Sequence, residues 1–304
     1  MAGRKGRPVD GILLLDKAVG ESSNQALQQV KRLYEARKAG HTGSLDCLAG
    51  GLLPICFGEA TKVSGYLLDA DKRYWAKCQL GVQTCTGDAE GEVVASAPIP
   101  ELDRATVERV LAGFVGEQDQ VPPMHSAIKQ GGQPLYKLAH RGITVPRAAR
   151  RVIIKQIQIV IIGSDSLELD VRCSKGTYIR TLAEDIGRAL GSCAFLAGLR
   201  RLAVGEFRVE QAATLEALQA DPGLEALDAR LLAADAALAN RPDIALTADA
   251  AYYLSRGQPV LVPHAPLQGL VRLYDPHRRF LGVGQVLDDG RIAPCRLLAA
   301  VGQS

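Results

Sequence analysis

The order of strand-like and helix-like patterns is the feature that most limits how this chain can fold. DKRYWAKCQLGV at 71–82 alternates in polarity as a half-buried strand does, and EVVASAP at 92–98 is its expected hairpin partner. VIIKQIQIVII and SLELDVRCS, at 152–162 and 166–174, are two further strands. Helical patterns separate the strands without a regular βαβ order. We therefore expect an α+β fold with a mixed, mostly antiparallel sheet flanked by helices.

Apolar residues at helical spacing predict where the helices lie. They occupy the segments 21–40, 105–116, 177–191 and 214–243. In the first segment, Ser22 or Ser23 can cap the N-terminus of the helix and Gly40 ends it. The last segment is rich in alanine and leucine, and we expect it to be helical throughout.

The pattern of the sequence changes near residue 244, from an alanine- and leucine-rich segment to short strand-like runs separated by turns. The stretch 269–298 has short strand-like runs and turns at Asp275–Pro276 and at 288–290. A chain of 304 residues with 47% hydrophobic content has room for one large domain and a small one. We therefore expect a first domain at 1–243 and a small β-rich domain at 244–304.

Several classes of protein are disfavoured by composition. The basic N-terminus is followed by an apolar run of only Ile12 to Leu15, too short for a signal peptide or a membrane span, so we expect a cytoplasmic protein. The seven cysteines lack zinc-finger spacing, and the five histidines form no HxH or HxxxH pair. We therefore expect no metal and no disulfide framework. The net charge of +3 permits a local nucleic-acid patch without requiring one.

A single carboxylate, Asp46, stands among small and apolar residues in HTGSLDCLAGG at 41–51. Such an aspartate commonly caps a turn through its side chain. It can instead be a nucleophile or base in a cleft, where glycines let a substrate approach the backbone. Cys47 and His41 offer a third reading, a cysteine–histidine nucleophile pair, although their spacing does not favour it. The residues alone leave these alternatives open.

A second group of candidates lies in CSKGTYIRTLAEDIG at 173–187. Lys175, Tyr178 and Arg180 fall between a strand end and a helix start, where side chains reach into clefts, although they can equally form a solvated basic turn. An arginine partner would keep Asp46 ionised in a partly desolvated pocket. Tyr74, on the apolar face of the 71–82 strand, is either a core residue or a third member of this site.

These stretches belong to a longer ordered series. The series comprises GILLLDKAVGESSN, HTGSLDCLAGGLLPICFGEATK, DKRYWAKCQLG, PPMHSAIK, PLYKLAHRG, CSKGTYIRTLAEDIG and LRRLAVGEF. In this order and spacing the motifs closely resemble the bacterial tRNA pseudouridine-55 synthases, the TruB family, over nearly the whole chain. The resemblance implies a pseudouridine-synthase domain followed, at 244–304, by an RNA-binding β-barrel of the PUA type.

The resemblance also implies an activity. It is the isomerisation of one uridine in the T-loop of tRNA, at position 55, to pseudouridine, without a metal or an organic cofactor. Asp46 falls on the family's catalytic aspartate and Arg180 on the basic partner of that aspartate. Attack at C6 of the base, attack at C1′ of the sugar and a glycal route through a sugar proton all remain open for Asp46.

Four further residues fall on positions that bind the substrate in the family. By the match, Tyr74 is the ring that stacks against the target base, and Tyr178 and Leu199 contact that base in the pocket. His41 falls on a residue that engages the flipped T-loop.

Basic side chains on loops are expected to hold RNA phosphates, although each can equally be a solvated surface charge. The candidates are Lys62, Lys129, Arg141, Lys175 and the 147–151 run. Lys129, Arg141 and the 147–151 run lie in the loop-rich segment 121–151, which we expect to bind RNA. The T-arm of tRNA is the expected partner. Nothing implies a membrane or a protein partner, and we expect a monomer.

Three positions depart from the family pattern. Cys47 replaces the usual proline after the aspartate, Gly50 stands where threonine is frequent, and His125 replaces a tyrosine. Loss of the proline frees the backbone beside Asp46, so we expect looser positioning there. These departures, with the PUA-like tail, leave an alternative: an RNA-binding or tRNA-folding module whose catalysis is secondary or lost. A sibling synthase that modifies another RNA is a third reading.

Overall fold

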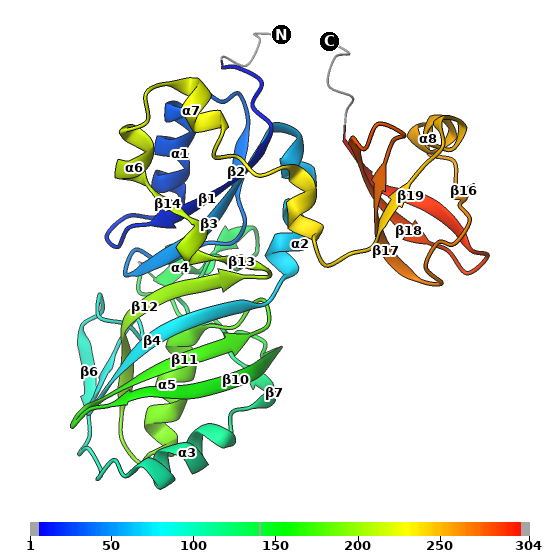
Figure 1. The fold of residues 1–304 in the computed structure, drawn as a ribbon. Helices are drawn as coiled ribbons and strands as arrows, with labels where there is room; N and C mark the ends of the chain where they lie inside the picture. Colours follow the sequence, from blue (N-terminus) through cyan, green and yellow to red (C-terminus); the bar gives the residue numbers. More distant parts are fainter. Residues whose placement is uncertain (1–5, 140, 299–304) are drawn as a thin grey trace.

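A ten-stranded mixed sheet forms the body of the molecule (Figure 1). The computed structural model describes residues 6–139 and 141–298. The strands follow the order β14-β1-β3-β12-β4-β11-β10-β7, with β13 on β12 and β2 on β3. Their bounds are β1 Gly11–Lys17, β2 Ala39–His41, β3 Ala49–Phe57, β4 Lys72–Leu80, β7 Gly116–Gln120, β10 Arg150–Ile162, β11 Ser166–Cys173, β12 Ala194–Val204, β13 Phe207–Arg208 and β14 Ala213–Thr214.

Most neighbours in this sheet are antiparallel. The exceptions are β1 with β14 and β3 with β12, which are parallel. The predicted mixed, mostly antiparallel sheet is therefore confirmed. The hairpin of EVVASAP forms beside the sheet, because β6 Val93–Ser96 pairs with the short β5 Val82–Thr84 that follows β4.

Helices cover the sheet at several places. The α-helices are α1 Ser23–Leu33, α2 Ser64–Asp69, α3 Arg104–Ala112, α4 Leu135–Ala139, α5 Ile179–Ala189, α6 Leu215–Gln219, α7 Leu224–Asp228 and α8 Ala248–Ser255, and the 3₁₀ helices are η1 Gly58–Lys62, η2 Val209–Gln211 and η3 Ala234–Leu238. In the described residues, no helix is long and apolar enough to cross a membrane.

Two helix predictions need correction. Ser22 caps α1 as expected, through a capping box with Gln25, but the helix ends at Leu33 because Glu35 takes a left-handed backbone conformation. The segment 39–41 then pairs with β3 as a strand. The Ala- and Leu-rich segment 214–243 is broken into α6, α7 and η3. Gly223, with φ of +124°, interrupts it.

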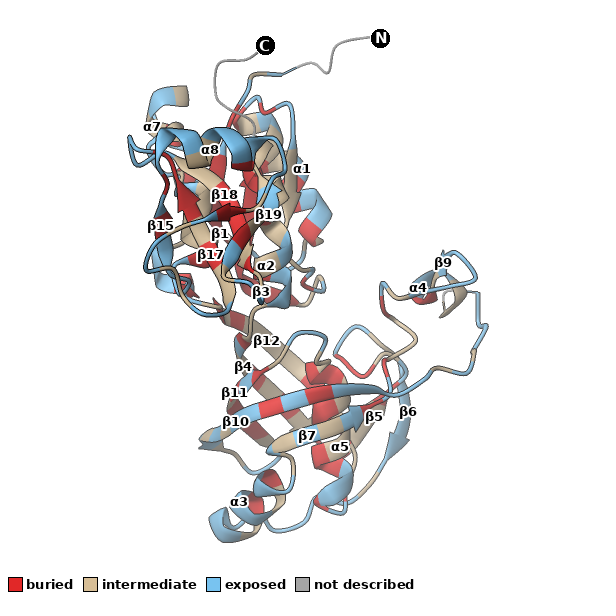
Figure 2. Cartoon of the chain, turned by 90° about the vertical axis from the view of Figure 1, so that its right-hand side faces the viewer, coloured by how far each residue is buried: buried red, intermediate tan, exposed pale blue. Residues whose placement is uncertain are grey.

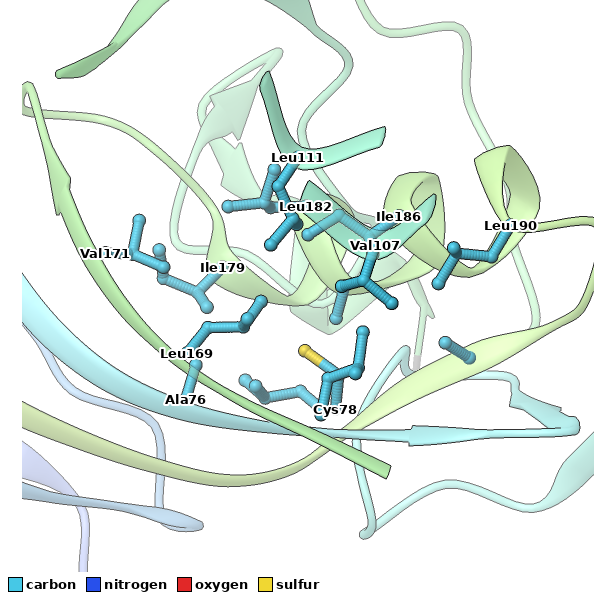
Figure 3. Close-up of a cluster of buried hydrophobic side chains, with 14 of the residues drawn as sticks. Ala76, Cys78, Val107, Leu111, Leu169, Val171, Ile179, Leu182, Ile186 and Leu190 are labelled. Atoms are coloured by element: carbon cyan, nitrogen blue, oxygen red, sulfur yellow. The ribbon is translucent and has the colours of Figure 1, made fainter. Parts of the chain in front are cut away.

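One hydrophobic core holds the strands and helices that carry the candidate site. Ala76 and Cys78 of β4 pack with Leu182 and Ile186 of α5, as Figure 3 shows. Val107 and Leu111 of α3 close the same cluster. Because α5 is held by its apolar face, its N-terminal residues are fixed against the end of β4 that carries Tyr74.

The C-terminal part is a separate five-stranded sheet with the order β15-β17-β18-β19-β16, and α8 packs on it (Figure 1). The bounds are β15 Asp243–Ala245, β16 Val260–Leu261, β17 Gly269–Tyr274, β18 Phe280–Val286 and β19 Arg291–Leu297. This confirms a small β-rich unit, while the boundary at 243 stays a prediction. Val63, Leu238 and Val283 are buried together where this sheet meets the body.

The loop-rich segment between β7 and β10 forms an arm, defined here as residues 121–149. It carries β8 Lys129–Gln130, β9 Gln133–Pro134 and α4. Figure 2 shows β9 and α4 protruding well away from the sheet. The buried Leu135 anchors the arm internally, and its backbone N–H donates to the carbonyl of Ile128 at 2.7 Å.

Candidate active site

The loop that carries Asp46 joins β2 to β3 and is tied down on both sides of the aspartate. Ser23 Oγ accepts a hydrogen bond from the N–H of Leu45 at 2.7 Å. The N–H of Gly20 donates to the carbonyl of Cys47 at 2.8 Å. These bonds hold the backbone on both sides of Asp46, and a looser loop caused by the missing proline at position 47 stays a prediction.

The close approach of this loop to its neighbour strand requires a glycine. Gly51, with φ of +98°, pairs with Arg201 of β12, and a Cβ at this position would lie 2.4 Å from the carbonyl oxygen of Arg201. No side chain fits there. Gly51 therefore allows β3 and β12 to pair closely beside the loop that carries the aspartate.

Asp46 lies in the wall between two cavities. Its side chain is 44% exposed. One cavity has a volume of about 340 Å³ and the other about 600 Å³, and Asp46 and Arg180 line both. The carboxylate is thus accessible from a hollow on either side, which a turn-capping aspartate does not require.

Arg180, the second residue of α5, is the charge partner of Asp46. Its Nη2 lies 3.1 Å from Oδ2 of Asp46, and its Nη1 lies 3.4 Å from Oδ2 of Asp88. The guanidinium also donates to the carbonyls of His125 at 2.7 Å and Thr86 at 3.2 Å. Its side chain is 6% exposed, so a buried charge is satisfied from four directions and its position is fixed.

The pKa of Asp46 is raised above its ordinary value. Burial in the cavity wall is the largest cause, and the charge of Asp88 adds to it, while Arg180 and Lys17 act in the opposite direction. Arg180 therefore favours the ionised form, as expected, but it does not outweigh the loss of water around the carboxylate. A carboxylate that is poorly solvated is a stronger nucleophile or base than an ordinary aspartate.

The smaller cavity is lined by the aromatic and apolar candidates. Tyr74, Tyr178 and Leu199 all contribute to it, together with Arg180. Tyr74 lies on the face of β4 that continues into the hydrophobic core, so it is both a core residue and a cavity residue. Burial raises the pKa of Tyr74, against the smaller opposing effect of Arg201. A cavity whose lining combines aromatic and apolar side chains with a single acid suits a planar base.

The larger cavity holds the predicted histidine. His41 ends β2 and lines this cavity with Asp46, Cys47 and His125. Burial, and then Arg201, lower the pKa of His41, so its neutral form is favoured. Within the described part of the chain, Nδ1 of His41 is buried without a hydrogen-bond partner, and no hydrogen bond joins His41 to Cys47. The geometry gives the cysteine–histidine pair no support.

Sequence reasoning missed three charged residues of the site. Asp88, with a side chain 3% exposed, holds the far side of Arg180. Arg201 is 1% exposed and donates to the carbonyls of Leu52 and Gly43. Lys72 donates to three carbonyls at the end of α2, and burial lowers its pKa to about 8. Charges inside a turn or an alternating strand are ordinarily solvated, so the sequence carried no signal for their burial.

The proposed phosphate contacts divide into two groups. Lys129 and Arg141 lie exposed on the arm. Lys62 pairs with Glu59 at 2.6 Å and donates to the carbonyl of Leu297 in the C-terminal sheet, and Lys175 pairs with Asp69 at 2.8 Å. Among the described residues, no group of three or more histidine, cysteine or acidic side chains is arranged to hold a metal.

Family comparisons cover almost the whole chain. A sequence profile described as TruB family pseudouridylate synthase (N terminal domain) matches residues 31–179. A profile for the tRNA pseudouridylate synthase B C-terminal domain matches 180–239, and one for Pseudouridine synthase II TruB, C-terminal, matches 242–298.

Curated relatives are similar over the same length. The tRNA pseudouridine synthase B of Nitrosococcus oceani is 57% identical over 296 residues, which cover 97% of this chain and 96% of the relative. The tRNA pseudouridine synthase B of Coxiella burnetii is 50% identical over 295 residues, covering 96% of each chain. That of Pseudomonas aeruginosa is 52% identical over 295 residues, covering 96% of this chain and 97% of the relative.

Solved structures share the fold. The crystal structure of a Cbf5-Nop10-Gar1 complex contains a chain that matches with a TM-score of 0.73 and 25% identity, covering 94% of this chain and 83% of that one. The structure of an H/ACA RNP bound to a substrate RNA containing 2'-deoxyuridine has a TM-score of 0.73 at 20% identity, covering 99% and 92%. The latter likeness extends to the fold alone.

Proposed function

The chain belongs to the TruB family of pseudouridylate synthases and isomerises uridine to pseudouridine in tRNA, and we propose that its target is uridine 55 of the T-loop, with Asp46 as the catalytic group. One observation carries the assignment of the aspartate. Its carboxylate lies 3.1 Å from the buried Arg180, at the rim of a cavity lined by Tyr74, Tyr178 and Leu199.

The base must leave the RNA stack before Asp46 can reach it. Extrusion of a base costs a few kcal/mol, and less from a loop than from a duplex. We propose that the uracil enters the smaller cavity and stacks on Tyr74, which returns about 1–3 kcal/mol. Tyr178 and Leu199 bound the same space, so they restrict the ring to a plane. His41, on the other side of Asp46, would occupy the gap that the base leaves.

The reaction rearranges one glycosidic bond. The bond between N1 and C1′ breaks, the uracil turns within the pocket, and a bond forms between C5 and C1′. C5 then loses its proton and N1, now free of the sugar, gains one, so product and substrate have the same composition. The uracil is recaptured and never replaced by water, so one acid is sufficient, whereas glycoside hydrolases normally use a pair of carboxylates.

Three roles of Asp46 satisfy this scheme. It can add to C6 of the base, add to C1′ of the sugar, or remove a sugar proton to give a glycal. Each role requires the ionised carboxylate, and the Arg180 guanidinium stabilises that form. Partial burial of the carboxylate reduces its solvation, which strengthens its electrostatic interaction with Arg180.

The rest of the tRNA is proposed to bind along the arm and the C-terminal sheet. Lys129 and Arg141 are exposed on the arm and are available to phosphates, whose contacts make binding salt-dependent. We further propose that the protein acts as a monomer without a protein partner.

A direct test uses an unmodified tRNA transcript and the purified protein. Mapping of pseudouridine on the product should find it at position 55. Modification at a different uridine would contradict the proposed site, and a transcript with an altered T-loop sequence serves as the control. Light scattering of the same preparation tests the monomer.

A further inference from the structure

Gln120 forms a two-point clamp on the backbone of Tyr178. Its Oε1 accepts from the N–H of Tyr178 at 2.7 Å, and its Nε2 donates to the carbonyl of the same residue at 3.0 Å. Gln120 is 6% exposed. The side-chain amide of Gln120 therefore holds both backbone polar groups of Tyr178, which lies 58 positions later in the sequence.

The clamp lies at the start of α5, where it affects the direction of the Tyr178 ring. Tyr178 is the N-cap residue of α5, where the backbone N–H groups lack helical partners. A tyrosine ring cannot accept hydrogen bonds from the first turn as a serine does, so the Gln120 amide supplies the polar contact at this helix start. The orientation of the Tyr178 peptide sets the direction of the ring, and Arg180 follows two residues later.

The clamp also lies where the sheet is least constrained. β7 stands at the end of the strand order beside β10, and Gln120 is the last residue of β7. The arm begins at the next residue. A strand end that leads into a protruding segment opens easily unless side chains fix it. The amide of Gln120 fixes this junction to the wall of the smaller cavity.

We propose that Gln120 is a positioning residue that holds Tyr178, and with it the base pocket, in the geometry required for turnover. The proposal rests on the proposed function, because it presumes that the smaller cavity receives the uracil. Gln120 does not line either cavity that contains Asp46, so it acts through Tyr178 rather than on the substrate.

The test replaces the amide without changing its size. Gln120→Met removes both hydrogen bonds and keeps the length of the side chain. We expect kcat to fall about 10- to 100-fold, as small misplacements of reacting groups do, while the Kd for tRNA stays within about threefold. Gln118→Met is the matched control, because Gln118 lies on the same face of β7 and its amide donates to the carbonyl of Gly113 at a long 3.5 Å. It should turn over at the wild-type rate.

A second measurement separates positioning from general stability. The fold-loss of kcat caused by Gln120→Met should be at least three times smaller in a Tyr178→Leu background than in the wild type. The reason is that the ring that Gln120 positions is absent from that background. An undiminished effect there overturns the proposal, as does a Q120M rate equal to that of Q118M. Should Q120M fail to fold, Gln120→Glu, which keeps the acceptor and loses the donor, is judged by the same criteria. Absence of pseudouridine with the wild-type protein would instead refute the proposed function.

Discussion

The guanidinium of Arg180 lies 3.1 Å from the carboxylate of Asp46 and is itself buried, while Asp46 opens onto a cavity on either side. The half-exposed carboxylate of Asp46 is thus held by a guanidinium whose position is fixed by its other hydrogen-bond and ion-pair partners. Asp88 completes the arrangement from the opposite side of the guanidinium at 3.4 Å. Two carboxylates share one positive charge, and this sharing governs how the site responds to pH and to substitution.

Replacement of Arg180 by methionine should shift the activity toward higher pH. The reaction needs the ionised carboxylate, so activity falls as pH drops through the pKa of Asp46, which already lies above its ordinary value. Arg180 lowers that pKa, and its loss raises it further. The acid side of the pH–rate profile should therefore move upward, and an unmoved profile would show that the ion pair does not control the acid.

The same substitution should destabilise the fold, because Asp88 is left buried without its partner. A broken buried ion pair typically costs about 3–5 kcal/mol of unfolding free energy. Denaturant titration of R180M checks this value. The double variant R180M/D88N should recover part of the loss, since the buried residue 88 then carries no unpaired charge. Equal stability of the single and double variants would exclude this cause.

Asp88→Asn should move the pH–rate profile in the opposite direction to R180M. The charge of Asp88 raises the pKa of Asp46, so its neutralisation lowers that pKa and extends activity to lower pH. The maximal rate should nonetheless fall about tenfold or more, because an amide N–H facing Nη1 of Arg180 displaces the guanidinium. A shift upward in pH would contradict the assigned sign.

Tyr74 tests the stacking role of the smaller cavity. Tyr74→Phe keeps the ring and removes the hydroxyl that lies near Arg201, whereas Tyr74→Leu removes the ring. If stacking dominates, Y74L should lose about 1–3 kcal/mol of transition-state stabilisation from kcat/KM and Y74F much less. Equal losses in the two variants would assign the effect to the hydroxyl.

The arm should carry part of the salt dependence of tRNA binding. Lys129→Ala and Arg141→Ala each remove one exposed cation, and each should reduce the slope of log K against log salt by about 1 if the residue contacts a phosphate. Arg104→Ala is the control, because this exposed arginine pairs with Glu108 on α3. An unchanged slope for both arm variants would show that neither residue contacts a phosphate and that the tRNA backbone binds elsewhere.

The structure brings together most of the residues that the sequence singled out, because these residues lie in motifs with local character, while their roles stay predictions. The alternation of β4 placed Tyr74 on its inner face, and the turn before α5 marked Tyr178 and Arg180. Asp88 could not be found in this way. It lies in a segment that reads as a turn, and its place beside Arg180 follows from a bridge to Leu196 on a distant strand.

Helix boundaries were predicted less well than the positions of the strands, for a physical reason. The apolar spacing of 21–40 continues past Leu33, but the left-handed Glu35 and the pairing of β2 with β3 override it. Similarly, alanine-rich composition favoured a continuous helix at 214–243, and Gly223 with tertiary packing broke it. Local propensity is a weak prior where a neighbouring strand offers an alternative set of hydrogen bonds.

Tritium release from tRNA labelled at C5 of uridine tests the role of Asp46 most directly, because isomerisation expels the hydrogen at C5. The wild-type protein should release one tritium for each site modified. Asp46→Asn keeps the size of the side chain and should bind the same tRNA with a Kd within about threefold of the wild type, yet release no tritium above background. Release by D46N at a rate within about tenfold of the wild type would contradict the account.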